Sequence, residues 1–160
     1  MRNDPGKPGN TTLPTQLPDS PRQLQRLALK VMRTFSAFRP RLVGWLANDV
    51  EVRHAPVQLL LHADTAEFVI LAMMDRGIHY REAEHRLYFS DGSQYAAPSF
   101  HFMQGEQAVE LIVTDERHQR KGTPIDPRSR KAKPGLSLKA LESVLESEEP
   151  NRSTPADSTR

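Results

Sequence analysis

The chain has 160 residues, of which 37% are hydrophobic and 26% are charged, and its formal net charge at pH 7 is +2. Because it contains no cysteine, disulfides, thiolate metal sites and a cysteine nucleophile are excluded, and the cytoplasm is the expected compartment. No apolar run approaches the roughly 18–20 residues that cross a membrane, so no membrane partner is expected.

The length predicts one domain, which we expect over residues 20–146, between disordered tails at 1–19 and 147–160. The first tail is rich in Pro, Gly, Asn and Thr and has few large apolar side chains. Burial of so little apolar surface cannot offset the entropy lost on ordering. The same segment lacks the apolar stretch of a secretory signal.

A first helix is predicted from Ser20. Ser20 can cap it, Pro21 suits the first helical position, and Gln23 completes a capping box. Apolar residues recur at helical spacing over 24–35, which predicts a face that packs on a sheet. Pro40 should end the helix before or near Arg39.

Two strands are expected next, at 41–47 and 56–62, joined by a loop at 48–55. Leu59, Leu60 and Leu61 are consecutive apolar residues without alternation. Such a run is typical of a strand that is buried on both faces, so the second strand should lie in the middle of the sheet.

A second helix is predicted from Asp64 or Thr65, and Gly77 is expected as its left-handed C-terminal residue. We assign its buried side to five apolar residues: Phe68, Val69, Leu71, Ala72 and Met73.

The rest of the domain should be mostly antiparallel. We predict a hairpin of strands 78–82 and 85–90, a turn at Asp91-Gly92, and a strand over 94–103 with a bulge or edge position at Pro98. A strand at 108–114, a basic loop at 115–135 and a helix starting near Ser137 complete the expected order.

Five short phrases, at 38–44, 61–67, 75–78, 109–111 and 123–126, together resemble a family of small bacterial nucleotidyltransferase-like proteins. The resemblance covers about residues 22–146. It implies an α+β fold in which a mixed or mostly antiparallel sheet has its helices packed on one face.

The parent superfamily has a Gly-Ser turn that approaches the triphosphate, then a Ser-Asp-hydrophobic-Asp strand, and a third carboxylate on a later strand. Those carboxylates hold magnesium for nucleotidyl transfer. In this chain Asp49-Val50 aligns with the turn, whereas Pro56 and Gln58 stand where the two aspartates are required. Glu110 matches the third carboxylate.

The first hypothesis is therefore a nucleotidyltransferase-like protein without metal-dependent catalysis that binds a nucleotide or a macromolecular partner. Glu110 is the catalytic candidate, Asp49 and Gln58 are ligand-binding candidates, and no metal ligand is assigned. An alternative is an active nucleotidyltransferase that combines Glu110 with Asp49 or Glu51. Magnesium is the expected cofactor only in that case.

A third hypothesis concerns the strongly basic segment 117–133, in which Arg128, Arg130 and Lys131 are candidates for binding phosphates. These cations would contact a nucleotide or make the chain a nucleic-acid-binding or regulatory module. No aromatic residue is interleaved for base stacking, so a solvated loop is the competing interpretation.

Plain structural roles compete with the other candidates as well. Glu110 would be an exposed strand residue paired with an arginine, and Gln58 a buried amide with satisfied hydrogen bonds. The six histidines have no metal-binding spacing, although His79 and His101 could meet across strands.

Overall fold

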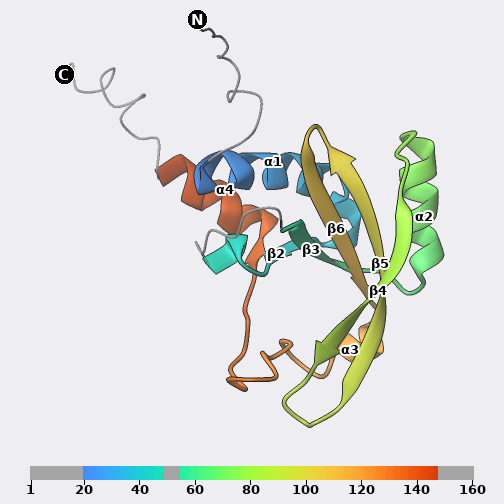
Figure 1. The fold of residues 1–160 in the computed structure, drawn as a ribbon, viewed down its shortest axis with the longest axis vertical. Helices are drawn as coiled ribbons and strands as arrows, with labels where there is room; N and C mark the ends of the chain where they lie inside the picture. Colours follow the sequence, from blue (N-terminus) through green and yellow to red (C-terminus); the bar gives the residue numbers. More distant parts are fainter. Residues whose placement is uncertain (1–19, 49–54, 148–160) are drawn as a thin grey trace, which may run out of the picture.

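The computed structural model describes residues 20–48 and 55–147 (Figure 1). Within them the chain is α+β, with one mixed sheet of six strands and four α-helices. The strands are β2 (Arg41–Val43), β3 (Val57–His62), β4 (Arg81–Tyr88), β5 (Gln94–Gln104), β6 (Gln107–Thr114) and β7 (Leu136–Ser137). The helices are α1 (Pro21–Thr34), α2 (Ala66–Asp75), α3 (Glu116–Gln119) and α4 (Leu138–Ser147). The expected N-terminal tail, residues 148–160 of the expected C-terminal tail, Asp49 and Glu51 lie outside the described residues. Ser147, which was predicted to belong to the C-terminal tail, is the last residue of α4.

The strand order is β4-β5-β6-β3-β2-β7. β3 and β6 pair in parallel, and the other neighbours pair antiparallel. The central position predicted for β3 is confirmed, and four of its six residues are buried. The parallel register sets Gln58 directly beside Glu110.

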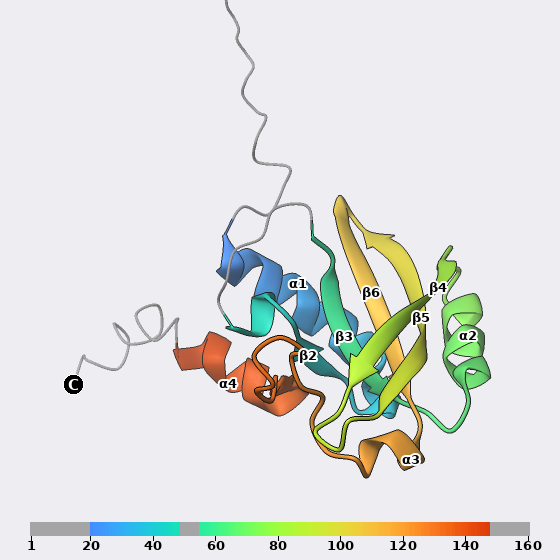
Figure 2. The ribbon, with the colours of Figure 1, turned by 60° about the horizontal axis from the view of Figure 1, so that its bottom comes forward.

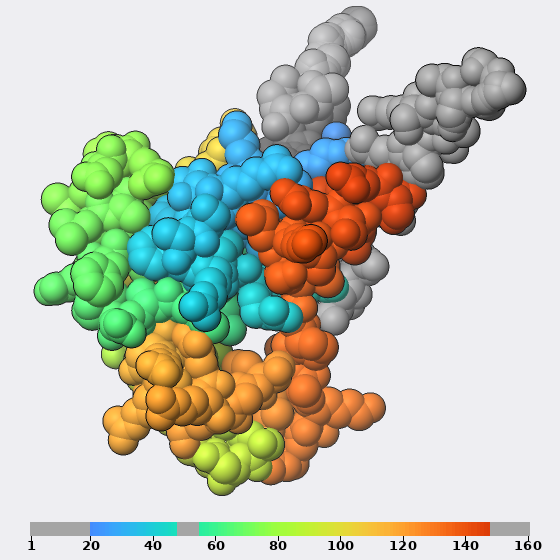
Figure 3. Space-filling view, turned by 180° about the vertical axis from the view of Figure 1, so that it is seen from behind, coloured from blue at the N-terminus to red at the C-terminus, as the bar shows by residue number. Residues whose placement is uncertain are grey.

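One face of the sheet is covered by α1, α2 and α4. Figure 3 shows α1 between the other two helices on this side of the molecule. Their buried side chains join those of the central strands in one large apolar cluster, which includes Met32, Phe35, Leu59, Met73, Leu111 and Leu141. This cluster is the main core of the protein, because burial of apolar surface is the dominant stabilising term.

The start of α1 is as predicted. The Ser20 side chain accepts a hydrogen bond from the Gln23 backbone, and the Gln23 side chain bonds back to the cap, with Pro21 at the first helical position. The helix ends at Thr34, and a single 3₁₀ turn over Ser36–Phe38 follows it.

The first strand is shorter than the predicted 41–47, because β2 stops at Val43. Gly44 adopts a positive φ of 78°, which an extended strand cannot contain, and a 3₁₀ turn follows over Leu46–Asn48. The Trp45 indole N–H then donates to the Pro56 carbonyl at 2.8 Å, which links the two ends of the undescribed segment 49–54.

The second helix starts at the predicted cap, with the Thr65 side chain accepting from the Glu67 backbone, and Gly77 has the expected positive φ of 68°. Its predicted buried side is wrong in part. Val69 and Met73 are buried, but Phe68 and Leu71 are more than half exposed. Ala66, Ile70 and Ala72 are partly buried and also pack against the main core, so α2 contacts the core with one face and leaves the side of Phe68 and Leu71 exposed.

The predicted hairpin of 78–82 and 85–90 is also wrong. β4 runs without a break from Arg81 to Tyr88 and pairs with β5, and the chain reverses at Asp91-Gly92 instead. No Gly, Pro, Asn or Asp stands between the two predicted strands, so local turn chemistry does not stop β4. Pro98 pairs with β4 just outside the β5–β6 register, which begins at Ser99, in agreement with an edge position.

The segment 115–135 was expected to be a loop, but it begins with the short helix α3. It then runs past the β4–β5 turn toward α4 (Figure 2). Ile125 forms a bridge to Tyr88, and the Lys121 ammonium lies 3.0 Å from the Asp91 carboxylate. These contacts hold the segment against the β4–β5 hairpin. The last helix begins beside Ser137, as predicted, and the Ser137 hydroxyl accepts from the Ala140 backbone.

Candidate functional site

The face of the sheet away from α1, α2 and α4 carries a mixture of apolar and polar side chains. Leu60, Leu87, Phe89, Ala97 and Ile112 form a second and smaller buried cluster. Because side chains alternate along a strand, Gln58 shares this face with Leu60, and Glu110 shares it with Ile112.

A cavity of about 660 Å³ lies between this face and the 118–135 segment. Small-molecule sites occupy roughly 300–1,000 Å³, so the cavity is large enough for a ligand of nucleotide size. Its apolar lining includes Val43, Leu60, Leu87, Phe89, Ile112 and Ile125. Its polar and charged lining includes Arg41, Gln58, His62, His85, Arg86, His118 and Lys133.

Glu110 is the centre of a polar cluster at this face. Its side chain is only 6% exposed. Gln58 Nε2 donates to Glu110 Oε1 at 3.1 Å. His85 Nδ1 and His101 Nε2 lie 3.1 Å and 3.5 Å from Glu110 Oε2.

The environment of Glu110 favours its charged form. Burial by itself would raise the pKa of the Glu110 carboxyl, but hydrogen bonds from His85 and Gln58 and the positive charge of His85 and His101 outweigh it. The pKa of Glu110 therefore lies below its usual value, and the group is an anion at neutral pH. An ionised carboxylate only accepts hydrogen bonds, so Nδ1 of His85 carries its hydrogen.

Two expectations about this cluster are wrong. Glu110 is buried rather than exposed, and among the described residues its partners are two histidines and a glutamine rather than an arginine. The histidine that joins His101 is His85, while His79 is exposed. His79 precedes β4, so it falls outside the β4–β5 pairing that brings His85 toward Glu110.

A second histidine of the cavity lining also pairs with a carboxylate. Asp115 caps α3 and accepts from the His118 backbone at 3.0 Å and from His118 Nδ1 at 2.7 Å. The His118 ring stacks on Tyr95, with ring centroids 3.5 Å apart and an angle of 9° between the planes. Burial would raise the pKa of Asp115, but hydrogen bonds from His118 and the charges of His118 and Arg117 lower it below its ordinary value.

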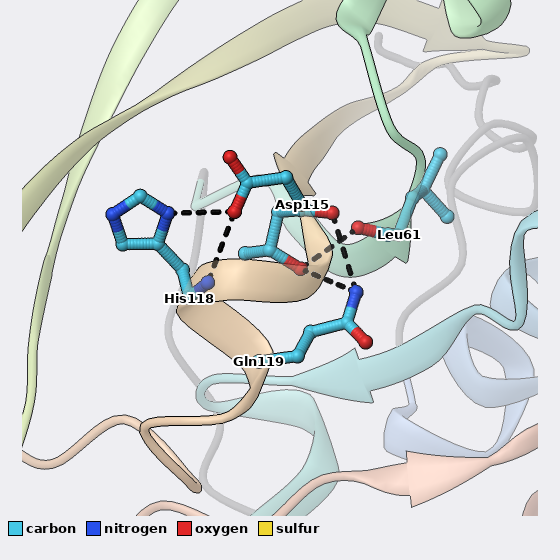
Figure 4. A network of polar contacts seen from close by, with 5 residues as sticks. Leu61, Asp115, His118 and Gln119 are labelled. Carbon is cyan, nitrogen blue, oxygen red and sulfur yellow. Dashed lines mark hydrogen bonds and ion pairs between the residues drawn. The ribbon is translucent and has the colours of Figure 1, made fainter.

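The start of α3 is fixed to the central strands by further hydrogen bonds (Figure 4). Thr114 Oγ1 donates to the Leu61 carbonyl at 3.2 Å. Gln119 Nε2 donates to the Thr114 carbonyl at 3.3 Å. The position of His118 at the cavity is therefore set by β3 and β6, through a helix of only four residues.

His62 stands at the end of β3 and also lines the cavity. Burial, and then the charges of Arg39 and Arg41, lower the pKa of its imidazole below the ordinary value of 6.5. At neutral pH the ring is therefore neutral. Its Nδ1 is buried and has no hydrogen-bond partner among the described residues.

The structure brings some of the predicted site residues together and leaves others apart. Gln58 and Glu110 are in direct contact. Arg128, Arg130 and Lys131 are exposed and are not part of the cavity lining, where the cations are Arg41, Arg86 and Lys133. The site residues that sequence reasoning missed are His85, Asp115 and His118. Only the last two had a sequence signal, an aspartate three residues before a histidine directly after a strand, which is typical of a capped helix start.

The surroundings of Glu110 do not fit magnesium. Magnesium prefers oxygen ligands, whereas Glu110 meets an amide N–H of Gln58 and the ring nitrogens of His85 and His101. Over 20–48 and 55–147, no three His, Asp or Glu side chains are grouped as ligands for a metal ion. In the same ranges no helix has the length and apolar character to cross a membrane.

Comparisons of the chain with models of protein families, with curated proteins and with solved structures found no match.

Proposed function

We propose that the protein is nucleotidyltransferase-like and that it binds a nucleotide in the 660 Å³ cavity without metal-dependent nucleotidyl transfer. The observation that carries this proposal is the composition of the cavity lining. Leu60, Ile112 and Ile125 provide an apolar surface for a base, and Arg41 and Lys133 are cations able to bind phosphate.

The contact between Gln58 and Glu110 supports the second half of the proposal. The resemblance aligns Gln58 with a metal-binding aspartate and Glu110 with the third carboxylate. Here the amide of Gln58 donates to Glu110 at 3.1 Å, so one oxygen of the remaining carboxylate is already bonded to an N–H. Binding of a macromolecular partner instead of a nucleotide would not explain why apolar side chains and cations line this cavity.

Thermal unfolding with and without nucleotide tests the proposal. Adenosine and guanosine mono-, di- and triphosphates are screened in EDTA and again in excess magnesium. A nucleotide at 100 times its dissociation constant stabilises the folded state by about 2.7 kcal/mol. We expect one of them to stabilise the protein equally in both buffers. Magnesium-dependent transfer of a nucleotide to an acceptor, lost in Glu110→Gln, would instead establish the active alternative.

A matched pair of lysines locates the site. Both lysines are exposed and lie in the same segment, but Lys133 lines the cavity and Lys131 does not. Lys133→Gln should weaken nucleotide binding about tenfold, and Lys131→Gln should leave it unchanged at physiological salt. Equal effects would mean that the basic segment acts through its overall charge and not through the cavity.

A second candidate function rests on the exposure of Arg128, Arg130 and Lys131 within four residues of one segment. Such a group can bind nucleic acid phosphates without entering the cavity. Filter binding of single-stranded RNA at several salt concentrations tests it. Binding should weaken steeply with salt and fall in the triple glutamine variant, and salt-insensitive binding would contradict this function.

A further inference from the structure

Two histidines that line the same cavity have the same arrangement. His85 and His118 each hold a carboxylate through Nδ1, at 3.1 Å from Glu110 and at 2.7 Å from Asp115. A carboxylate on Nδ1 fixes the tautomer and stabilises the imidazolium, which leaves Nε2 to accept or donate a proton. The cavity therefore holds two oriented imidazoles, supplied by different elements, β4 and α3.

The two pairs differ in burial. The Glu110 side chain is 6% exposed, whereas the Asp115 side chain is 35% exposed. A buried anion acts on its neighbour through a lower effective dielectric constant. This difference in burial between the two carboxylates is the ground for assigning the role of proton donor to His85 and the role of proton acceptor to His118.

Other charged groups surround both rings. His101 of β5 shares Oε2 of Glu110 with His85. Arg41, His62, Arg86 and Lys133 belong to the same cavity lining. Tyr95 of β5 stacks on His118, and Arg117 acts on Asp115. These cations and the two carboxylates are the charged groups that surround His85 and His118.

We propose that His118 and His85 are the general base and general acid of a metal-independent hydrolase that cleaves a phosphodiester of a nucleoside in this cavity. The substrate class rests on the proposed function, since the same apolar lining and cations would hold the nucleoside and the phosphate. Glu110 and Asp115 are positioning residues in this site, because each acts through its histidine.

The reaction balances without a cofactor. His118 Nε2 removes a proton from a water molecule, and the water oxygen forms a bond to phosphorus. The phosphorus–oxygen bond to the leaving alcohol breaks, and the departing oxygen takes a proton from His85 Nε2. The products are a nucleoside monophosphate and an alcohol. His118 loses its proton to solvent and His85 regains one, which restores the starting state.

Two probes with one nucleoside and different leaving groups test the roles separately. Thymidine 5′-(methyl phosphate) releases methoxide, which must be protonated as it leaves, whereas thymidine 5′-(4-nitrophenyl phosphate) releases a stable nitrophenolate. Both are incubated with the protein in EDTA. A general acid or base contributes about 10²–10⁴-fold, so His118→Asn should lower the rate by at least 100-fold with both probes. His85→Asn should do so with the methyl ester and much less with the nitrophenyl ester.

Asparagine is the informative replacement because its amide N–H can occupy the place of Nδ1–H and keep the bond to the carboxylate, while Nε2 is lost. His79→Asn, at an exposed position outside the cavity lining, is the matched control and should change neither rate. Thermal unfolding of each variant separates loss of the fold from loss of the acid or base. Where His118→Asn does not fold, Asp115→Asn replaces it and should shift the acidic limb of the pH–rate profile, because that limb reports the deprotonation of the general base.

The outcomes are distinct. A bell-shaped pH–rate profile in EDTA, with the leaving-group pattern above, supports the acid–base pair. Nucleotide binding with no turnover of either probe overturns it and leaves the proposed function intact. Turnover that EDTA abolishes, or that survives both asparagine variants, also overturns it. If the folded wild-type protein neither binds a nucleotide nor turns over either probe, the proposed function is overturned as well.

Discussion

The two faces of the sheet differ in composition, although the residues of one face alternate with those of the other along the same strands. The helix-covered face is filled with apolar side chains from α1, α2, α4 and the central strands. The other face has a smaller apolar cluster, three polar residues around Glu110, and a cavity in place of close packing. One face thus supplies most of the apolar core, and the other has polar side chains and a cavity where the first is closely packed.

Leu59 and Leu60 are adjacent residues on these opposite faces, and truncating each compares the faces directly. Leu59 is fully buried in the main core, so Leu59→Ala should lower the free energy of unfolding by about 2–5 kcal/mol. Leu60 borders the cavity, so Leu60→Ala only enlarges a space that already exists and should lower the free energy of unfolding by less than Leu59→Ala does. Urea unfolding measures both, and equal losses would mean that the cavity wall is packed as tightly as the core.

Glu110→Gln tests whether the polar cluster also contributes to stability. Loss of hydrogen bonds to a charged group should lower the free energy of unfolding by about 1.5–3 kcal/mol at pH 7. The folded-state pKa of Glu110 is depressed below its ordinary 4.5, so its stabilisation is present above that value and is lost as pH falls through the folded pKa. The wild type should therefore lose its advantage over Glu110→Gln in urea unfolding between pH 5 and more acidic pH, by about the same 1.5–3 kcal/mol. Glu106→Gln, at an exposed turn, is the control and should be neutral.

Gly44→Ala tests how closely β2 approaches the polar cluster. Gly44 has a φ of 78°, and an added Cβ would overlap Gln58 Oε1. Strain and overlap together should destabilise the protein by more than about 1 kcal/mol. Gly92→Ala has a comparable positive φ of 90° but open space around it, so it measures the strain alone. In the double variant with Gln58→Ala, the part of the destabilisation that comes from the overlap should disappear. If the losses in free energy of unfolding of the two single variants simply add in the double variant, Gly44 and Gln58 do not interact.

The smallest effect is expected on the outer side of α2, where the prediction of a buried side was wrong. Leu71 is 56% exposed, so Leu71→Ala should change the free energy of unfolding by less than about 0.5 kcal/mol. Met73 is fully buried two residues away, and Met73→Ala should cost about 2–5 kcal/mol. A large loss for Leu71→Ala would indicate that a second copy or another partner covers this side in solution.

The sequence by itself determined the features that depend on neighbouring residues. The capping box at Ser20, the left-handed Gly77, the turn at Asp91-Gly92 and the central position of β3 follow from local chemistry and from one unbroken apolar run. Each needs interactions only within a few positions, so a pattern in the chain is enough to predict it.

Only the tertiary structure decided which groups the polar residues contact. Glu110 was a candidate from its place in a strand, but its partners Gln58 and His85 are 52 and 25 residues away. Sheet register and the path of the 115–135 segment bring these groups to one cavity. Side-chain alternation fixes which residues share a face, but not which faces meet or what covers them. That choice depends on the free energy of packing the whole chain, which no short pattern encodes.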